Sequence, residues 1–361
     1  MRWSGYVGGR LQIDATVFDN DERGPKDIGG IQARRARLDV GGTVGDCSFV
    51  TELEFADDVV ELKETTLATQ FGPGQVIVGH TLPYITMDAR TSSSHAPFIE
   101  RSMLTGMLWP TYRWAAVYQG YTDHSIWHVS AYNQDADDAE DADGWGAVTR
   151  LAWVPTYGER HFLHLGVGAG AEQFGISNAI DPETGDHPAQ GATVSVWPIG
   201  RMGMRARTTL LQINNGKRVD DHKGSLEIAG GLGRFSFQAE GGRADYDDGI
   251  ETGEVNGYFG LVTWFLTDDV HPYDRKLGRF ARVKPKHPFG AFEVGARFEH
   301  SHGEQGGAEG ALTRDIDIEA ISATLNWYRN PYIRFSLDVT HAKIDDELND
   351  VAHADSLLIR R

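Results

Sequence analysis

Hydrophobic and polar positions alternate along much of this 361-residue chain. Segments of about 8 to 14 residues show the alternation and are separated by turn-rich sequence. From Tyr6 to Phe18 one face carries Val7, Leu11, Ile13, Ala15 and Val17, and the other carries Arg10, Gln12, Asp14 and Thr16. The segments 289–299 and 333–340 repeat the pattern. Because successive side chains of a strand point to opposite faces, each segment is predicted to be a strand with one apolar face.

About sixteen to eighteen such segments follow one another, with sixteen the favoured count, and no long helical pattern lies between them. No stretch approaches the roughly 18 apolar residues that a membrane-spanning helix needs. Some connections are tight, such as Gly231–Gly233, while those at 134–144 and 267–287 are long and charged. Short turns at one rim and long loops at the other are typical of outer-membrane barrels. The pattern therefore predicts an all-β fold, a single transmembrane antiparallel β-barrel over residues 1–361.

Composition agrees with this fold. The mean hydropathy of −0.38 would suit a soluble protein, but a barrel needs only one apolar face per strand. Aromatic residues gather near the predicted strand ends, where girdles at the two membrane interfaces are expected: Trp109, Tyr112, Trp114, Trp127, Trp145, Trp153, Trp264, Trp327 and Tyr328. Charged residues on the alternate faces imply a wet interior. A soluble β-sandwich or soluble barrel remains the alternative fold.

Motifs of enzymes are missing from the sequence. The fourteen histidines are scattered without HExxH spacing, there is no GxSxG, and the single cysteine, Cys47, has no partner for a metal-binding pair. The run Gly166–Gly170 imitates a nucleotide-binding loop but lies within a strand pattern that no helix follows. We therefore expect no enzymatic activity, no cofactor and no nucleic-acid partner.

Several short motifs resemble the phosphate-selective porin O and P family, in order along nearly the whole chain. They are Ile31–Leu38, Glu61–Ala68, Val78–Pro83 followed by Glu100-Arg101-Ser102, Tyr258–Thr267, Pro288–Arg297, and Leu325–Pro331 with Arg334. The resemblance implies a sixteen-stranded barrel in the bacterial outer membrane, usually a homotrimer. It also implies passive diffusion of small anions such as phosphate through a pore narrowed by an inward-folded third loop. By position this constriction loop is 83–110, with Arg90, His95, Glu100 and Arg101.

Alternation assigns further arginines to the wet face. Together with the loop arginines, the candidate pore-lining and anion-binding set is Arg10, Arg35, Arg37, Arg90, Arg101, Arg150, Arg201, Arg205, Arg207, Arg297 and Arg334. A guanidinium group suits phosphate because its planar fork donates paired hydrogen bonds to oxyanions. Each arginine taken alone could instead pair with a carboxylate on a neighbouring strand. Arg34 has the opposite parity, which predicts a lipid-facing or subunit-interface position, or a β-bulge.

The net charge of −18 opposes an anion pore. Six acidic residues of the predicted external loop 134–144 are weak candidates for a divalent-cation site, since carboxylate oxygens suit Ca²⁺: Asp135, Asp137, Asp138, Glu140, Asp141 and Asp143. The predicted external loop 267–287 is basic and could contact lipopolysaccharide phosphates, attract anions, or pair with the acidic loop. A general or cation-preferring porin, and a structural or anchoring barrel, therefore remain as alternatives.

Overall fold

A computed structural model describes residues 3–19, 29–56, 59–134, 143–175, 191–201, 207–307, 311–346 and 351–360. Nearly all of this part of the chain is β-structure. The elements in order are β1 (Trp3–Asp19), β2 (Gly30–Val44), β3 (Cys47–Glu54), β4 (Glu61–Phe71), β5 (Gly74–Thr81), α1 (Met87–Arg90), α2 (Met103–Leu108), β6 (Arg113–Tyr121), β7 (Ser125–Asn133), β8 (Trp145–Tyr157), β9 (His161–Phe174), β10 (Ala192–Val196), β11 (Thr208–Ile213), β12 (Val219–Leu232), β13 (Phe235–Asp247), β14 (Glu251–Phe265), β15 (Tyr273–Asp274), β16 (Arg279–Phe280), β17 (Ala291–Gly307), β18 (Leu312–Asn330), β19 (Ile333–Asp346) and β20 (Val351–Arg360).

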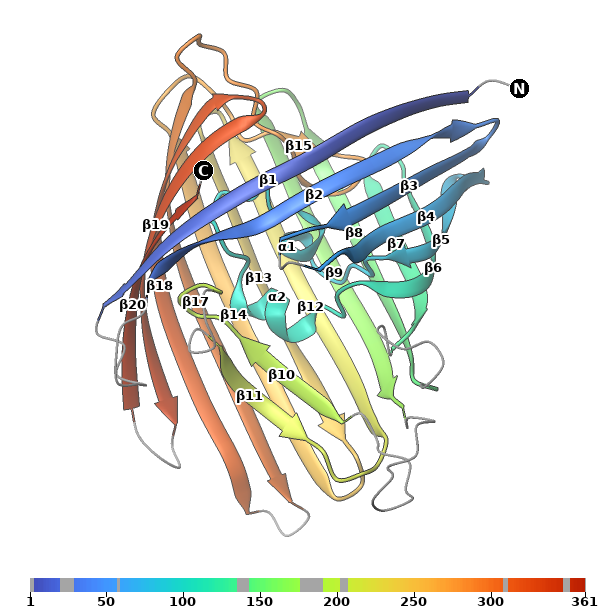
Figure 1. Cartoon of the computed structure of the whole chain (residues 1–361), viewed down its shortest axis with the longest axis vertical. Helices are drawn as coiled ribbons and strands as arrows, with labels where there is room; N and C mark the ends of the chain where they lie inside the picture. Colours follow the sequence, from blue (N-terminus) through green and yellow to red (C-terminus); the bar gives the residue numbers. More distant parts are fainter. Residues whose placement is uncertain are drawn as a thin grey trace.

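Sixteen of these strands form one closed antiparallel barrel (Figure 1). Each barrel strand pairs with its neighbour in the chain, apart from the hairpins β10–β11 and β15–β16, which form separate two-stranded sheets. The barrel closes where β20 pairs with β1, with Asp14 opposite Arg360 and Asp19 opposite Asp355. A closed barrel leaves no unpaired sheet edge, so the backbone is satisfied within the membrane. The predicted fold class and the favoured strand count are confirmed. The two helices are short, and no helix in the described ranges is long and apolar enough to cross a membrane.

The strand order decides at which end of the barrel each connection lies. Strands alternate in direction, so the tight turns at 45–46, 72–73, 122–124, 158–160, 233–234 and 331–332 all lie at one end, which we call the short-turn end. The connections after β5, β7 and β9 lie at the other, long-loop end. The long connection between β14 and β17 lies at the short-turn end. The basic segment 267–287 therefore lies at the opposite end from the last residue of β7 and the first of β8, which the acidic segment 134–144 connects. This corrects the expectation that both segments belong to one outer rim. The length of the two connections was the only basis for that expectation.

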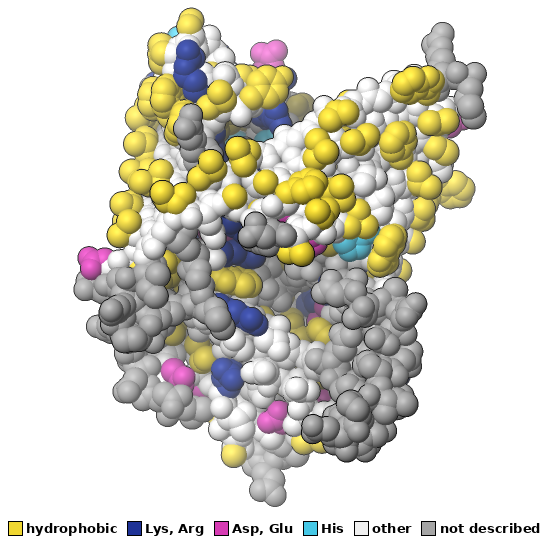
Figure 2. Space-filling model, in the orientation of Figure 1, with side chains coloured by type: hydrophobic (Ala, Val, Ile, Leu, Met, Phe, Trp, Pro, Cys, Tyr) yellow, Lys and Arg dark blue, Asp and Glu magenta, His cyan; other side chains and the backbone are white. Residues whose placement is uncertain are grey.

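The two faces of the wall differ as the alternation predicts. On β1 the side chains of Val7, Leu11 and Val17 are 74%, 65% and 59% exposed, whereas Gln12 and Asp14 are buried on the inner face. Figure 2 shows apolar side chains covering the outer face of β1 to β5, with Lys and Arg side chains in the opening below them. Large apolar residues exposed around the rest of the wall complete a surface suited to lipid.

The prediction that the aromatic residues near strand ends form girdles on the outer face is confirmed only in part. Trp114, Trp145, Trp153 and Trp264 are about half exposed on the outer face. Tyr328 instead is buried, and its hydroxyl donates to Glu293 Oε2 at 2.7 Å. Trp109 and Tyr112 belong to the connection between β5 and β6 and take part in the interior. Proximity to a strand end does not distinguish a girdle residue from one that turns inward.

Three connections fill much of the barrel interior. Segment 82–112 carries α1 and α2, the hairpin β10–β11 packs against α2 and against β14, β17 and β18, and segment 266–290 carries β15 and β16. Small residues on the wall make room for them. A Cβ atom on Gly168 would lie 2.2 Å from the main-chain oxygen of Ile85, and one on Gly257 would lie 2.6 Å from the Met107 side chain. These glycines let the inserted segments approach the wall closely.

Candidate pore constriction

The constriction segment 82–112 owes its shape to two capped short helices. Thr86 caps α1, its Oγ1 accepting from the Ala89 N–H at 3.1 Å, and Ser102 caps α2, its Oγ accepting from the Thr105 N–H at 3.2 Å. Hydroxyl caps of this kind satisfy donors that a helix start leaves free. The Asp88 carboxylate joins the two helices, because its Oδ2 accepts from the Ser102 N–H at 3.0 Å and from the Thr105 hydroxyl at 2.6 Å. The segment is thus held as one ordered unit.

Carboxylates of the far wall accept hydrogen bonds from the main chain of this segment. Glu227 and Glu240 accept from the N–H groups of Met87 and Asp88 at 2.5 and 2.9 Å. Asp338 and Glu299 accept from Ile99 and Met103, each at 2.7 Å. These contacts reach β12, β13, β17 and β19, so the segment crosses the interior instead of extending outward. The expectation of an inward-folded third loop is confirmed.

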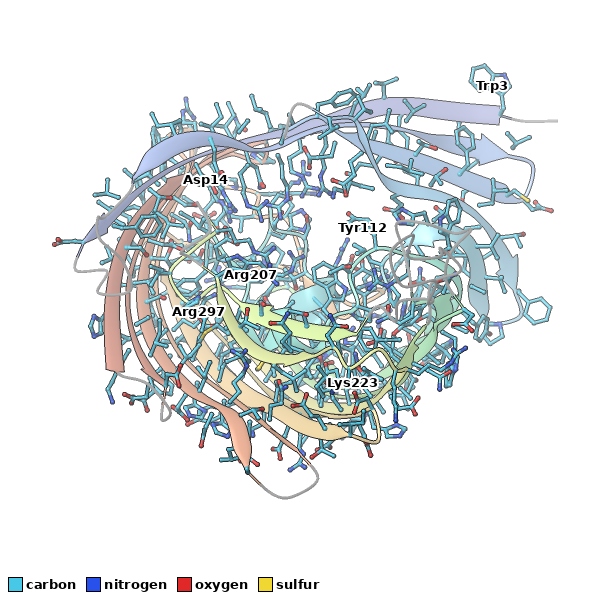
Figure 3. The ribbon with its side chains drawn as sticks, turned by 60° about the horizontal axis from the view of Figure 1, so that its bottom comes forward. Trp3, Asp14, Tyr112, Arg207, Lys223 and Arg297 are labelled. Atoms are coloured by element: carbon cyan, nitrogen blue, oxygen red, sulfur yellow. The ribbon has the colours of Figure 1, made fainter. Side chains whose placement is uncertain are left out.

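An arginine-rich cavity of about 340 Å³ lies between this segment and the wall formed by β1 to β4. Nine cationic side chains line it: Arg10, Arg34, Arg35, Arg37, Lys63, Arg90, Arg101, Arg201 and Arg279. Three carboxylates, Glu52, Glu64 and Glu100, share the lining, which leaves a formal excess of six positive charges. Figure 3 looks into the barrel from the long-loop end and shows Tyr112, another lining residue, beside the open interior. We call this space the arginine cavity.

Two β-bulges add cations to the arginine cavity that strict alternation misses. In the pairing of β1 with β2, Gln12 faces Arg35 but Ile13 faces Ala33, so Arg34 is an extra residue. In the pairing of β3 with β4, the register likewise shifts around Lys63. A bulge disrupts the alternation of faces. Arg34 therefore lines the cavity together with its neighbour Arg35, and Lys63 together with its neighbour Glu64. A lipid-facing or interface position for Arg34 is therefore wrong, while the alternative of a bulge is confirmed.

The wall arginines of the cavity are partly committed to neighbours. Arg37 donates from Nε to Glu54 at 2.6 Å and from Nη1 to Glu52 at 2.5 Å. Arg35 donates to the Gln12 amide oxygen at 2.7 Å, a neutral partner. Arg10 donates to the hydroxyls of Ser92 and Ser93, each at 3.2 Å. Arg37 thus has carboxylates within hydrogen-bond distance. Arg10 has Glu52 only at ion-pair distance, 3.7 Å from its Nη2, and Arg35 hydrogen-bonds to a neutral partner.

The arginines of the inserted segments are oriented by aromatic rings and carbonyl groups. Arg90 lies over the Tyr84 ring at 4.2 Å, Arg101 over Trp109 at 4.8 Å, and Arg201 over Trp197 at 3.9 Å. Such cation–π stacking holds a guanidinium group without neutralising it. Burial lowers the pKa of Arg90 to about 10, which leaves it protonated at neutral pH. Arg90 therefore remains cationic while it stacks on Tyr84.

Other predicted arginines occupy different places. Arg150, Arg297 and Arg334 lie on inner faces but bind the inserted segments: their guanidinium groups donate to the carbonyls of Gly278 at 2.7 Å, Glu100 at 2.8 Å and Ala96 at 2.5 Å. Figure 3 shows Arg297 pointing inward from β17. Arg207 is exposed and directly precedes β11. Arg205 lies outside the described residues.

The second inserted segment reaches the first from the short-turn end. Arg279 donates to the main-chain oxygen of Arg90 at 3.1 Å, and His271 lies 3.2 Å from the oxygen of His95. Burial, and then Arg279 and Arg282, lower the pKa of His95 to about 3. Arg279 also lines the arginine cavity. The prediction that 267–287 is an external loop misses this role, because nothing in the local pattern indicates which way a long connection folds.

Most residues of the predicted divalent-cation site are not among those that the structure describes. Asp135, Asp137, Asp138, Glu140 and Asp141 lie outside the described residues, and Asp143 pairs with Arg218. Within the described ranges no group of three or more His, Cys, Asp or Glu side chains is placed to hold a metal ion. The divalent-cation site stays an untested hypothesis.

Comparison with known proteins identifies the family. A sequence model of the phosphate-selective porin O and P family matches residues 6–360. The chain belongs to this family. An uncharacterised protein of Caulobacter vibrioides is 28% identical over 358 residues, which cover 91% of this chain and 66% of that protein. The porin described here therefore spans just under two-thirds of the length of that relative.

Solved structures of outer-membrane proteins share the fold. A loop-deletion form of OmpT, an outer-membrane protein of Vibrio cholerae, aligns over 99% of this chain and 98% of its own, with a TM-score of 0.60 and 16% identity. An anion-selective porin from Comamonas acidovorans aligns over 100% of this chain and 99% of its own, with a TM-score of 0.58 and 11% identity. Together with the family match, the closed barrel makes this protein a porin of the bacterial outer membrane. Family and fold point to a channel and not to an enzyme.

Proposed function

We propose that this porin conducts small anions, phosphate among them, in preference to cations. The observation that carries the proposal is the lining of the arginine cavity, where nine cations face three carboxylates. Selectivity in a wide barrel comes from the constriction and the charges around it. Arginine adds a preference for oxyanions, because its fork can donate two parallel hydrogen bonds to one phosphate group.

The charge of the whole chain does not decide the selectivity. The acidic connection 134–144 joins β7 and β8, whose joined ends lie at the long-loop end. The field of exposed charges falls off over a Debye length of about 8 Å at physiological salt. An ion inside the cavity instead touches the arginines themselves. The family is described as phosphate-selective and one structural relative as anion-selective, which supports the proposal.

The acidic residues of the connection 134–144 favour a second candidate function, that of a general or cation-preferring porin. Conductance in planar bilayers separates the two, with one ion of the salt exchanged at a time. If the pore prefers anions, replacing K⁺ by Li⁺ will leave the conductance nearly unchanged, and replacing Cl⁻ by acetate will lower it. The opposite dependence would establish the cation-preferring alternative. A folded protein with no conductance would support an anchoring barrel.

We also propose that the porin assembles as a homotrimer with its apolar outer wall against lipid and lipopolysaccharide. One solved form of the structurally similar OmpT is described as a trimer, at 13% identity and a TM-score of 0.57. The exposed apolar faces of β1 to β5 offer a surface for subunit contact as well as for lipid. The mass of the detergent-purified protein by light scattering tests the assembly. A monomer mass would reject it.

A further inference from the structure

Glu100 holds an unusual place among the residues of the arginine cavity. Its Oε1 lies 3.6 Å from Arg34 Nε and 3.7 Å from Arg360 Nη2, and its Oε2 lies 3.7 Å from Arg201 Nε. The three cations come from β2, β20 and the segment after β10. One carboxylate is therefore surrounded by arginines from three separate parts of the chain, as a bound anion would be.

The contacts between the Glu100 carboxylate and these three arginines are ion pairs at long distances. All three distances exceed the 2.7–2.9 Å typical of a charge-assisted hydrogen bond, and within the described residues the Glu100 carboxylate makes no hydrogen bond. Arg34 Nε is buried and has no hydrogen-bond partner in the part of the chain that the structure describes. Burial would raise the pKa of Glu100, but Arg34, Arg360, Arg201 and Arg35 together lower it to about 2. The group is thus a permanent anion that leaves donors of its neighbours unused.

The position of segment 82–112 near Glu100 does not depend on the Glu100 side chain. Arg297 Nη1 donates to the Glu100 main-chain oxygen at 2.8 Å, and Arg360 Nη1 donates to the Ile99 oxygen at 2.7 Å. The Ile99 N–H donates to Asp338 at 2.7 Å. Hydrogen bonds of the main chain therefore position the segment, and the Glu100 carboxylate is not needed for this and can interact with permeating ions.

We propose that Glu100 is a resident counter-ion that a permeating anion displaces from Arg34 and Arg201. This inference rests on the proposed anion preference and names a residue that sets its strength. Conduction needs a site that binds well enough to admit an ion and weakly enough to release it. Competition from Glu100 lowers the affinity of the arginines for a passing oxyanion, and so hastens its release.

An orienting role for Glu100 predicts the opposite sign. If the carboxylate served to hold Arg34 and Arg201 in a binding geometry, its removal would weaken anion binding. If it competes with the anion, its removal will strengthen binding. The affinity for inorganic phosphate therefore separates the two roles, which a change in overall selectivity would not.

The test titrates inorganic phosphate against the chloride current of the reconstituted full chain and compares half-inhibitory concentrations. Glu100→Gln and Glu100→Ala should each lower this concentration about tenfold, because a unit charge at contact distance in a partly dry site changes binding by at least that much. Glu100→Asp keeps the charge and should stay within about threefold of the unsubstituted porin. Glu64→Gln removes one charge from the same lining, away from Arg34 and Arg201, and should shift the value less than about threefold.

Three outcomes would overturn the inference. Unchanged or weaker phosphate inhibition in both Glu100→Gln and Glu100→Ala would assign Glu100 an orienting role or none. An equal shift in Glu64→Gln would show a general effect of charge and no local competition. A current of the unsubstituted porin that prefers cations would reject the proposed function itself, whereas anion preference with unaltered phosphate affinity rejects only the role of Glu100.

Discussion

Arg297 on β17 donates from Nη1 to the main-chain oxygen of Glu100 at 2.8 Å, so a wall arginine supports the constriction segment. The same guanidinium group pairs with Glu299 at 2.8 Å and lies over the Phe98 ring at 4.6 Å. Arg334 acts similarly on Ala96. The inward-facing arginines therefore form two groups, one that lines the arginine cavity and one that holds the inserted segments in place.

Arg297→Ala should destabilise the barrel and loosen the constriction. The substitution removes the hydrogen bond to Glu100 and leaves Glu299, which is 2% exposed, without its cation. Loss of one partner of a buried pair costs about 3 kcal/mol. The unfolding midpoint in urea with lipid vesicles should fall, and single-channel current should become noisier. Arg243→Ala removes the same charge from the outer surface, where Arg243 is exposed, and should change neither. Equal behaviour of the two variants would contradict the supporting role.

Arg10→Ala combined with Arg35→Ala should lower the chloride-to-potassium permeability ratio several-fold. Both side chains line the arginine cavity, and their hydrogen bonds go to neutral partners, Ser92, Ser93 and Gln12. Arg10 also lies 3.7 Å from Glu52, which keeps Arg37 as its cation when Arg10 is removed. Their removal takes two charges from the lining and orphans no hydrogen-bonded carboxylate. Reversal potentials measure the ratio, and the double variant Arg243→Ala with Lys343→Ala, outside the bore, is the charge-matched control. A ratio that falls equally in the control would place selectivity at the barrel surface.

Arg35→Lys should separate charge from shape. The lysine keeps the positive charge but loses the planar fork that can bind an oxyanion through two hydrogen bonds. The chloride-to-potassium ratio should therefore stay close to that of the unsubstituted porin, while inhibition of the chloride current by phosphate weakens about threefold to tenfold. Phosphate inhibition that is unaffected would mean that Arg35 contributes only its charge.

Neither His95 nor Glu100 should change the selectivity between pH 4 and pH 8. The pKa of His95 is lowered to about 3 by burial and by Arg279, Arg282, His271 and Arg334, so His95 stays neutral across this range. The pKa of Glu100 is lowered to about 2, so its carboxylate stays charged and is protonated only in stronger acid, where anion preference should rise. Reversal potentials over the pH series measure this. A transition in this range that disappears in His95→Ala or in Glu100→Gln would show that the substituted group titrates normally.

The sequence predicted the barrel because the membrane imposes a strict rule. Lipid outside and water inside force side chains to alternate, as in Val7, Leu11 and Gln12 on β1, and that period is visible without any tertiary information. Strand pairing to the next neighbour then follows from the short connections. The family resemblance supplied the inward direction of segment 82–112, which no local pattern contains.

The site was predicted less completely, for two physical reasons. Bulges at Arg34 and Lys63 change the register by one residue, and a single strand does not reveal where its partner will be mismatched. Alternation also reports only that a side chain points inward. Whether it then meets open space, like Arg35, or an inserted carbonyl, like Arg150, depends on how distant segments fold.

The most direct test of the account is the zero-current potential of the unsubstituted porin in a planar bilayer with a tenfold KCl gradient. The excess of cations in the arginine cavity predicts a potential of the sign set by chloride, negative on the dilute side, with chloride more permeable than potassium. A potential of the opposite sign would show that potassium is preferred, and would contradict the claim that these arginines control the pore.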